Sequence, residues 1–474
     1  MNIPFVGPAY EARSLNVDAQ RSLNCYMEAD NASPRAPLAL YGTPGTALRF
    51  TLATVGVRGV IRQGIYCYWV AGNSVYRVAA DYTATLLGTI GTSAGAVGLA
   101  TNGAETLIVD GVSGWIANGV TLTEIADVDF PDGVTVATFE DGYFIVAGGG
   151  SSRFYINETP NAGTVWDGTD FASAEGSPDN TIALISDHRE LWLGGADSFE
   201  VWVNTGNSDF PFERSGNTFI EHGCAAAATL GKLDNTVFWL GSSESGGAVV
   251  FRSQGYTPAR ISNHAIERAM QSYATVSDAF AYTYQIEGHA FYVLTFPTAD
   301  ATWVYDVATN QWHEWAWRDP ADNTLHRHRS NCHVFFNGEH LVGDYETGAV
   351  YALSLDTYTD NGDPILRLRA SQCLDSKDGS RLYYQDMQVD METGVGLATG
   401  QGSAPLLMMR YSNDGGHTWS GIKTRSVGAV GEYGRRVKFG PTGAGRNRVW
   451  EISMTDPVKF AVMGAFSRFD KGVS

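Results

Sequence analysis

Short runs of aromatic and β-branched residues recur along the first three quarters of the chain, and each is followed by a turn and a second run. In LWLGGADSFEVWV, for example, Gly, Ala and Asp separate two apolar runs. The second run alternates with a period of two, with Phe199, Val201 and Val203 set against Glu200, Trp202 and Asn204. Because successive side chains of a strand point to opposite faces, each unit is predicted to be a β-hairpin.

Seven of these hairpins follow one another at intervals of 37 to 53 residues, with a mean of about 45. Their first apolar residues are Tyr68, Leu107, Phe144, Leu191, Phe238, Phe291 and Leu341. Four-stranded propeller blades repeat at about this spacing, whereas a β-sandwich array places its turns roughly every 8–12 residues without a longer period. The sequence therefore predicts an all-β chain with a β-propeller of six or seven blades, since seven hairpins need not mean seven complete blades.

The segments on either side of the hairpins lack this repeat. Residues 1–40 are rich in Pro, Asn and Ala, and we expect them to form an extended N-terminal arm over a neighbouring surface. The β-propeller is assigned to residues 41–364. Residues 365–474 change to longer alternating strands, such as LYYQDMQVDM and VKFAVMGAF, and are predicted to form a smaller C-terminal antiparallel β-domain.

The composition favours sheets over helix bundles, because charged residues make up only 18% of a chain that has 54 glycines and 12% aromatic residues. The formal net charge of −19 argues against a general DNA-binding surface. From Ile365 onward there are 15 Lys and Arg against 10 Asp and Glu, and before it 17 against 41. This reversal of sign indicates a domain boundary near Asp363–Leu366, with different partners on either side. The positive charge is assigned to Arg367, Arg369, Arg435, Arg436, Lys438, Arg446 and Arg448.

The cysteines and the apolar runs bear on the compartment. The five cysteines are odd in number, widely spaced and without a CxxC pair, so reduced thiols in a protein assembled in the cytoplasm are the simplest interpretation. The N-terminal MNIPFVGPAYEARS has no basic segment followed by an apolar one, and no apolar run approaches the roughly 18 residues that span a bilayer. Neither a signal peptide nor membrane insertion is expected.

The most specific short motif is SNDGGHTW, which matches the S-x-D-x-G-x-T-W pattern of the Asp-box. It places Ser412, Asp414, Gly416, Thr418 and Trp419 in one predicted hairpin. The carboxylate can accept backbone and hydroxyl hydrogen bonds inside the turn, glycine permits a positive φ, and tryptophan packs on the turn. We expect these five residues to staple a structural hairpin and not to be catalytic.

Two weaker motifs resemble enzyme or calcium sites. GTSAG at 91–95 matches the pattern of a hydrolase serine, but a strand-like stretch follows where the nucleophile elbow needs a helix. DVDFPDG at 127–133 lacks the acid and glycine spacing of an EF-hand loop. We therefore predict no catalytic and no cofactor-binding residue.

A third motif, HRHRSNCH, gathers possible metal ligands. They are His326, His328, Cys332 and His333. In a strand the first two would share a face, so a metal is conceivable, but Arg327 and Arg329 would repel a cation. A polar loop or a strand edge is favoured, and no metal-binding residue is predicted.

Several longer segments together resemble one protein family. They are SLNVDAQRSLNCYMEA, YGTPGT, WDGTDFASAEGSPDNTIAL, RELWLGGADSFEVWVNTG and GHAFYVLTFPTADATWVYDVATNQWHEW, in order from about Ser14 to Trp315. The C-terminal VWEISMTDPVKFAVMGAF also ends in the family's manner. The sequence resembles packaged-DNA stabilisation proteins of short-tailed double-stranded DNA bacteriophages, also called tail hub or nozzle proteins.

The resemblance implies a structural virion protein of a phage tail, assembled in the host bacterial cytoplasm. It implies a six-fold ring of this chain below the head-to-tail adaptor and portal proteins, near tail needle, fibre or tailspike proteins. Such a ring would close the DNA exit channel, retain the genome and conduct it at ejection, while genomic double-stranded DNA passes through the lumen without sequence-specific binding. The family brings no catalytic residues and no cofactor.

Two other functions stay open at this point. A receptor- or glycan-binding tail propeller is suggested by 12 Trp and 22 Tyr, because aromatic faces stack on sugars, although the propeller cores can absorb most of these rings. A glycosidase acting on the cell envelope is suggested only by the Asp-box. The net charge of −19 favours mechanical closure of a passage over DNA binding, and a mostly acidic lumen would let DNA slide.

Overall fold

The fold is that of a computed structural model, which describes residues 1–29, 37–177, 179–242, 247–376 and 378–472. Residues 30–36 of the predicted arm and the turn of the fifth hairpin, at 243–246, lie outside these ranges. The described residues are almost entirely strands and turns, with one α-helix, α1 (His264–Gln271), and one 3-10 helix, η1 (Ala227–Thr229). The all-β prediction is confirmed.

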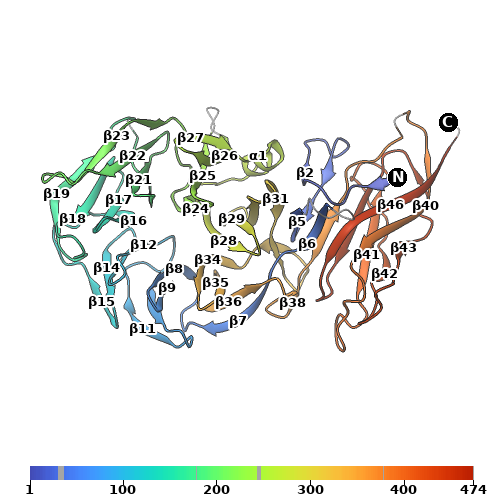
Figure 1. The fold of residues 1–474 in the computed structure, drawn as a ribbon, viewed down its shortest axis with the longest axis horizontal. Coiled ribbons are helices and arrows are strands. Elements are labelled where there is room, and N and C mark those ends of the chain that lie inside the picture. Colours follow the sequence, from blue (N-terminus) through green and yellow to red (C-terminus); the bar gives the residue numbers. More distant parts are fainter. Residues whose placement is uncertain (30–36, 178, 243–246, 377, 473–474) are drawn as a thin grey trace.

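Four-stranded antiparallel sheets, or blades, form a ring on the left of Figure 1. The first strands of most neighbouring blades lie against one another around the centre. These inner strands are β8 (Val57–Gln63), β12 (Gly98–Thr101), β16 (Val134–Glu140), β20 (Ala183–Asp187), β24 (Gly231–Leu233), β28 (Phe280–Ile286) and β34 (Ser330–Phe336). The prediction of a β-propeller is confirmed, and strand pairing gives seven such blades in the described residues.

The predicted hairpins are the second and third strands of the blades. The second strands are β9 (Tyr66–Ala71), β13 (Thr106–Val109), β17 (Tyr143–Gly148), β21 (Glu190–Gly194), β25 (Thr236–Ser242), β29 (His289–Phe296) and β35 (Glu339–Asp344). The third strands are β10 (Ser74–Val78), β14 (Gly114–Asn118), β18 (Arg153–Asn157), β22 (Phe199–Asn204), β26 (Ala248–Gln254), β30 (Ala301–Asp306) and β36 (Ala349–Ser354).

The outer strand of the seventh blade comes from the N-terminal side of the propeller. The outer strands are β11 (Ala84–Thr89), β15 (Thr121–Glu124), β19 (Trp166–Ser173), β23 (Phe212–Ile220), β27 (Thr257–Arg260), β31 (Gln311–Glu314) and, for the seventh blade, β7 (Gly45–Thr51). Strand β7 pairs antiparallel with β36, with Ala47 opposite Ala352. The ring is therefore closed by hydrogen bonds between the two ends of the propeller sequence.

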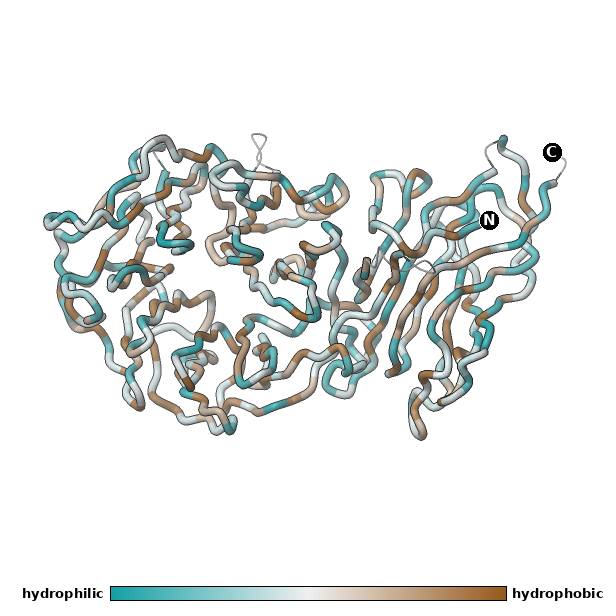
Figure 2. The backbone as a smooth tube through the Cα atoms, viewed as in Figure 1, coloured by the Kyte–Doolittle hydropathy of each residue, from teal (hydrophilic) through white to brown (hydrophobic). Residues whose placement is uncertain are grey.

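Each blade contributes to two cores, one with each neighbouring blade. On β21, Leu191 and Leu193 pack with Ile145 of the third blade, whereas Trp192 between them packs with Trp239 of the fifth. The same division recurs around the ring, so that a hydrophobic cluster fills each space between neighbouring blades. Figure 2 shows hydrophobic segments along the strands of both domains and hydrophilic segments at many of the turns. A single blade could not bury both of its faces, and the ring buries them all.

The second domain is a two-sheet β-sandwich on the right of Figure 1. One sheet has the order β43 (Val437–Phe439), β40 (Leu382–Met391), β46 (Ala461–Lys471), β6 (Leu38–Gly42) and β5 (Cys25–Ala29), with β1 (Asn2–Ile3) on β46 and β44 (Ala444–Gly445) on β40. The other contains β4 (Ser22–Leu23), β39 (Arg367–Ala370), β45 (Val449–Met454), β41 (Leu406–Ser412) and β42 (Lys423–Ser426). Met387, Phe439 and Trp450 lie in the core between them. The prediction of a smaller antiparallel β-domain is confirmed.

The N-terminal segment differs from the expected arm. Strands β1, β4 and β5 pair with strands of this same chain, and β2 (Tyr10–Glu11) and β3 (Ala19–Gln20) form a short hairpin beside them. The edges of the sandwich sheets offer unpaired backbone groups, and pairing with residues 1–29 satisfies them. The three remaining short pairs are β32 (Ala316–Arg318) with β33 (Leu325–Arg327), and β37 (Thr359–Asp360) with β38 (Asp363–Pro364) and β7.

Candidate functional site

The sixth blade and one sheet of the sandwich form a single nine-stranded sheet through the N-terminal segment. Leu23 of β4 pairs in parallel with Glu314 of β31 on one side and antiparallel with Leu368 of β39 on the other. Two residues of β4 thus join strands that belong to different domains. We refer to this region as the joint.

Polar side chains fix the joint on both sides of β4. The Arg21 guanidinium lies 2.6 Å from the Glu314 carboxylate, and burial raises the pKa of Glu314. The Asn24 amide donates to the carbonyls of Ala316 and Leu366 at 2.9 and 3.0 Å, and its oxygen accepts from the Ala316 amide at 2.8 Å. Asn24 has a φ of 53°, a left-handed conformation that asparagine tolerates better than most residues. The side chain of Asn24 therefore hydrogen-bonds to backbone groups on both the propeller side and the sandwich side of the joint.

A buried histidine connects the N-terminal segment to the sixth blade. His289 on β29 lies 2.9 Å from Asp306 of β30 and 2.7 Å from Glu28 of β5, and only 4% of its side chain is exposed. Burial lowers the pKa of His289, but the two carboxylates outweigh burial and raise the pKa to about 9. His289 is therefore protonated at neutral pH and bridges two negative charges from different elements.

Two buried arginines of β39 hold the chain on the sandwich side of the joint. Arg369 donates to the carbonyls of Phe5, Gly7 and Pro8 at 2.7 to 2.9 Å and to the Gln20 side chain at 3.0 Å. Arg367 is also fully buried, and it donates to the backbone carbonyls of Tyr358 and Asp456 at 3.2 and 3.4 Å. Burial lowers the pKa of Arg369 to about 10, so it keeps its charge at neutral pH. These arginines hold the chain together and add nothing to the surface charge.

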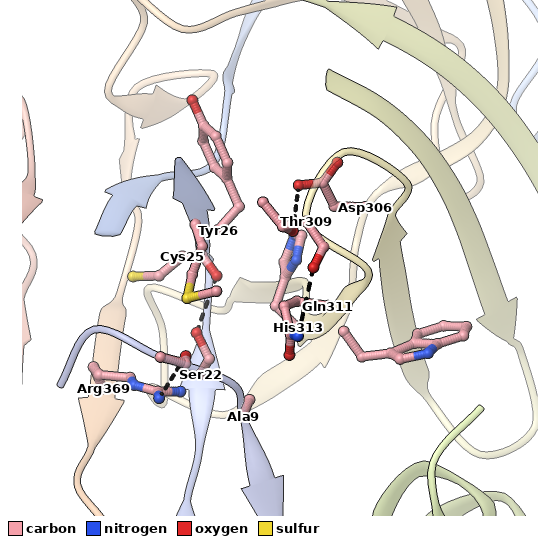
Figure 3. A pocket seen from close by; sticks show the side chains of 12 residues that line it. Ala9, Ser22, Cys25, Tyr26, Asp306, Thr309, Gln311, His313 and Arg369 are labelled. Carbon is pink, nitrogen blue, oxygen red and sulfur yellow. Dashed lines mark hydrogen bonds between the residues drawn. The ribbon is translucent and has the colours of Figure 1, made fainter. Parts of the chain in front are cut away.

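Three small cavities lie at the joint. The smallest, of about 10 Å³, is drawn in Figure 3, with Ser22, Cys25 and Arg369 on one side and Asp306 and His313 of the sixth blade on the other. Two larger ones, of about 250 and 280 Å³, lie beside α1 and beside β6 respectively. The smallest has room for about one water molecule. The joint is thus closely filled between Ser22 and His313, whereas the cavity beside α1 leaves open space next to Arg21 and Glu314.

The mouth of the propeller centre is a wider cavity of about 830 Å³. Residues in and beside the turns between the first and second strands of the fourth to seventh blades form it. His188 lies 2.8 Å from Asp187 and 2.6 Å from Asn235, and these hydrogen bonds raise the pKa of His188. His333 and His340 lie 3.0 Å apart, and burial lowers the pKa of His333 to about 3.

The Asp-box residues converge in the turn after β41. Asp414 accepts from the Ser412 hydroxyl at 2.6 Å, from the Thr418 amide at 2.8 Å and from the Thr418 hydroxyl at 2.5 Å. These hydrogen bonds hold the pKa of Asp414 well below its usual range. The Ser412 hydroxyl also accepts from the Gly416 amide at 2.8 Å. The geometry agrees with a stapled hairpin, and the stapling role stays a prediction.

The same turn receives the N-terminal segment. A Cβ on Gly415 would lie 1.7 Å from the Asn16 side-chain oxygen, and φ at Gly415 is 75°. Trp419 and Leu15 pack against the small cluster of Ala19, Ala370 and Val449. Residues 15–19 therefore lie on this hairpin, and they can approach it closely because Gly415 has no side chain.

The four possible metal ligands of HRHRSNCH do not converge. His326 hydrogen-bonds Asp300 at 2.7 Å, and His333 faces His340. His328 stacks on Trp315 with ring centroids 3.7 Å apart, and burial lowers its pKa to about 3. Burial also raises the pKa of Cys332 to about 12. Across the described ranges, no group of three His, Cys, Asp or Glu side chains could hold a metal ion.

Sequence reasoning missed the joint and misplaced part of the basic charge. Arg367, Arg369 and Arg448 are fully buried, whereas the other four basic residues of that group are exposed. Arg448 lies 4.1 Å from the ring centroids of Tyr384 and Tyr411, and its Nε donates to Asn413 at 2.8 Å. The alternation in LRLRA does place Arg367 and Arg369 on one face, but it cannot say which face is inside.

A ring of blades closed by its own N-terminal side, and continued through a shared sheet into a sandwich, defines a two-domain β-scaffold. The chain belongs to the bacteriophage P22 Gp10 family, the packaged-DNA stabilisation proteins of short-tailed phages. Residues 3–358 match the model described as bacteriophage P22 Gp10, beta-propeller, and residues 368–469 match bacteriophage P22 Gp10, beta-sandwich. The resemblance stated from the sequence is confirmed, and the chain is a structural protein of a phage tail.

The other comparisons add no functional argument. The N-terminal domain of Nup159 is 8% identical over 70% of this chain and 98% of that chain, with a TM-score of 0.43. PorZ of Porphyromonas gingivalis is 11% identical over 80% of this chain and 46% of that chain, with a TM-score of 0.41. A chain of the Mitotic Checkpoint Complex is 11% identical over 66% of this chain and 93% of that chain, with a TM-score of 0.43. No curated protein sequence matches the chain. In the part of the chain that the structure describes, no helix is long and apolar enough to cross a membrane.

Proposed function

We propose that this chain is the hub, or nozzle, of the phage tail. Six copies form a ring below the portal and adaptor proteins, close the DNA exit channel, retain the genome until infection and conduct it at ejection. Tail needle, fibre or tailspike proteins lie nearby. The observation that carries the proposal is the pair of family matches, which follow each other in this chain and cover both domains.

The joint supports a load-transmitting role. A hinge between the domains would let internal DNA pressure bend each subunit, whereas a sheet continuous across both domains resists bending through its hydrogen bonds. The arginine and asparagine contacts of the N-terminal segment add further links between the same strands. Such a subunit suits a wall that must hold its shape until a specific signal opens it.

Net charge supports retention by closure and not by DNA binding. With −19 per chain, six copies carry a large negative charge that repels phosphate. In this proposal DNA slides past a mostly acidic lumen, and basic wall residues act as brakes. Changing lumen acids to Lys should slow or block ejection, and unchanged ejection kinetics would contradict this part of the proposal.

The first test is a count of full and empty heads by electron microscopy, in phage with a stop codon in this gene. We expect heads that package normally and then lose their DNA, so empty heads accumulate. Supplying the wild-type chain from a plasmid should restore full heads. Full, stable particles that merely fail to adsorb would contradict the hub function.

A receptor- or glycan-binding tail propeller is the alternative. The number of aromatic residues suggests it, but none of the 12 Trp is exposed, and the blade and sandwich cores contain or contact most of them. The receptor- or glycan-binding function is still favoured by the cavity at the propeller mouth, which has Tyr284 and Phe335 in its lining. A binding screen of the isolated chain on host polysaccharides separates the two functions.

A further inference from the structure

Exposed basic residues of the sandwich gather at the end of the molecule that lies away from the propeller (Figure 1). Five bases lie within 16 positions, on or beside β42 and β43, with Glu432 as the one acid among them. We call this surface the basic edge; its residues are Lys423, Arg425, Arg435, Arg436 and Lys438, all exposed. The edge holds much of the domain's outward positive charge, because three other arginines are buried.

The basic edge also has features of a protein interface. Ile422, Val430 and Tyr433 are 61%, 61% and 74% exposed within it. Strands β42 and β43 each end their sheet, and the Arg425 guanidinium donates to the carbonyls of Thr424 and Lys438 at 2.8 Å between them. Lys438 pairs with Asp386 at 2.9 Å and Arg435 with Glu432 at 3.8 Å, and no ion pair with another described residue neutralises Lys423 or Arg436. Arginine with tyrosine and aliphatic side chains is the composition that protein interfaces favour.

The opposite end of the long axis is acidic. Residues 124–179 contain 11 Asp and Glu against one base, Arg153, and they include β18 and β19 on the far left of Figure 1. The loop after β15 lies on β19, since Asp127 accepts from the Trp166 amide at 3.1 Å. We call this surface the acidic end; its residues are Glu124, Asp127, Asp129, Asp132, Glu158, Asp167 and Asp170.

The charges of the acidic end are not compensated within the described chain. None of its carboxylates forms an ion pair with a described residue, and the one base nearby, Arg153, lies over the Phe171 ring. Partial burial raises the pKa of Asp170, and repulsion from the neighbouring Asp167 and Glu158 raises it further. Val128 in the same loop is 94% exposed. The acidic end therefore also combines charge with exposed apolar side chains.

We propose that the basic edge of one copy binds the acidic end of the next, so that this contact forms the ring. The inference rests on the proposed ring and names its contact surfaces. The two surfaces differ, carry opposite charge and lie at opposite ends of a subunit held stiff by the joint, which is the arrangement a head-to-tail contact needs. DNA would also suit the bases, but it would leave the apolar side chains and the acidic end without a partner.

Three full-length variants test the contact. The edge variant carries Lys423→Glu, Arg435→Glu and Arg436→Glu, which changes the formal charge of the edge, Glu432 included, from +4 to −2. The end variant carries Glu124→Lys, Asp129→Lys, Asp132→Lys, Glu158→Lys and Asp170→Lys, which changes the formal charge of the end from −7 to +3. The double variant carries all eight changes. Arg13→Glu with Arg381→Glu, two exposed bases outside the edge, is the matched control. Each chain is supplied from a plasmid to phage with the stop codon, infectious particles are counted, and purified chains are compared by sedimentation velocity. Thermal melting confirms that each variant folds.

The pattern of rescue decides the proposal. The edge and end variants alone should each lose at least about 100-fold in particle number, because like charges then face each other. Together they should recover to within about tenfold of wild type, since they can alternate in an even-numbered ring, and the double variant should also recover. Normal yield from each single variant overturns the proposal, as does failure of both the mixture and the double variant. Loss with the edge variant alone, accompanied by weaker DNA binding, assigns the basic edge to DNA instead.

A different result would contradict the proposed hub function, independently of the contact between copies. The hub function fails if phage lacking this chain keep their DNA, whatever the variants do. In that case sedimentation of the purified chains still decides the contact, because alternation of the edge and end variants in one complex is visible without any phage.

Discussion

At the scale of single residues, a few buried polar side chains decide where the N-terminal segment lies. Arg369 is one of them, because its planar guanidinium can donate several hydrogen bonds in fixed directions. It uses them on three backbone carbonyls and one side chain of residues that are more than 340 positions away in sequence. No apolar side chain could satisfy those buried carbonyls.

Replacing that arginine should therefore release the first residues of the chain. We expect Arg369→Met to lower the free energy of unfolding by about 2–4 kcal/mol, because the buried carbonyls of Phe5, Gly7 and Pro8 lose their donor. Urea titration measures the loss, and hydrogen exchange should become faster in residues 1–11. Arg381→Met, at an exposed site, is the control. Unchanged exchange in residues 1–11 would contradict the anchoring role.

The Asp-box turn allows a similarly specific test at Gly415. We expect Gly415→Ala to destabilise the fold by about 1–3 kcal/mol, because φ is 75° and the new Cβ would meet Asn16. Gly431→Ala isolates the backbone part, since Gly431 has a φ of 88° and open space around it. Asn16→Gly should relieve part of the loss in the Gly415 variant and none in the Gly431 variant. Equal losses in the two alanine variants would show that the N-terminal segment does not rest on this turn.

At the scale of elements, the sequence predicts what is local and misses what is distant. The hairpins follow from period-2 runs such as FEVWV, where every second residue feeds one core, and their turns are adjacent in sequence. The pairing of β4 with β31 and β39 joins residue 23 to residues 314 and 368. A two-residue strand has no period to detect, and its partners follow only once both domains are folded. The Asp-box residues were predictable from one turn, but not the segment that lies on them.

The His289 bridge makes the link between β5 and the sixth blade pH-dependent. Its pKa is about 9 in the folded protein against 6.5 unfolded, so its contribution is complete below pH 6.5 and is lost as the pH rises through 9. His313 beside it has a pKa lowered by burial to about 4 and stays neutral in that window. The joint should therefore weaken on the alkaline side.

The measurement compares wild type with His289→Gln by thermal melting between about pH 6 and 9.5. The variant should be less stable by about 3 kcal/mol at the acid end, which corresponds to the difference between a pKa of 6.5 and one of about 9, and this difference in stability should narrow as the pH rises. His417→Gln, at an exposed histidine, should track wild type throughout. A gap that stays constant with pH would mean that His289 is not charged in the fold.

At the scale of the whole molecule, stiffness and charge distribution act together. The shared sheet fixes the sandwich relative to the propeller, so the acidic end and the basic edge keep opposite positions along the long axis. A flexible linker would let one copy's own surfaces meet and neutralise each other. In a rigid subunit the basic edge and the acidic end cannot reach each other, so each can pair only with the opposite charge of a neighbouring copy.

Salt should therefore control how these chains associate. Contacts between exposed charges are screened over about 8 Å at physiological ionic strength and about 3 Å in 1 M salt, so we expect the wild-type chain to dissociate progressively between about 50 and 500 mM salt. The double variant should show a slope of the same sign, because the signs of both surfaces are exchanged. The edge and end variants alone should respond in the opposite direction, since salt screens their repulsion. Sedimentation equilibrium of all four chains measures the slopes, and association that strengthens with salt in the wild type would assign the contact to the apolar side chains instead.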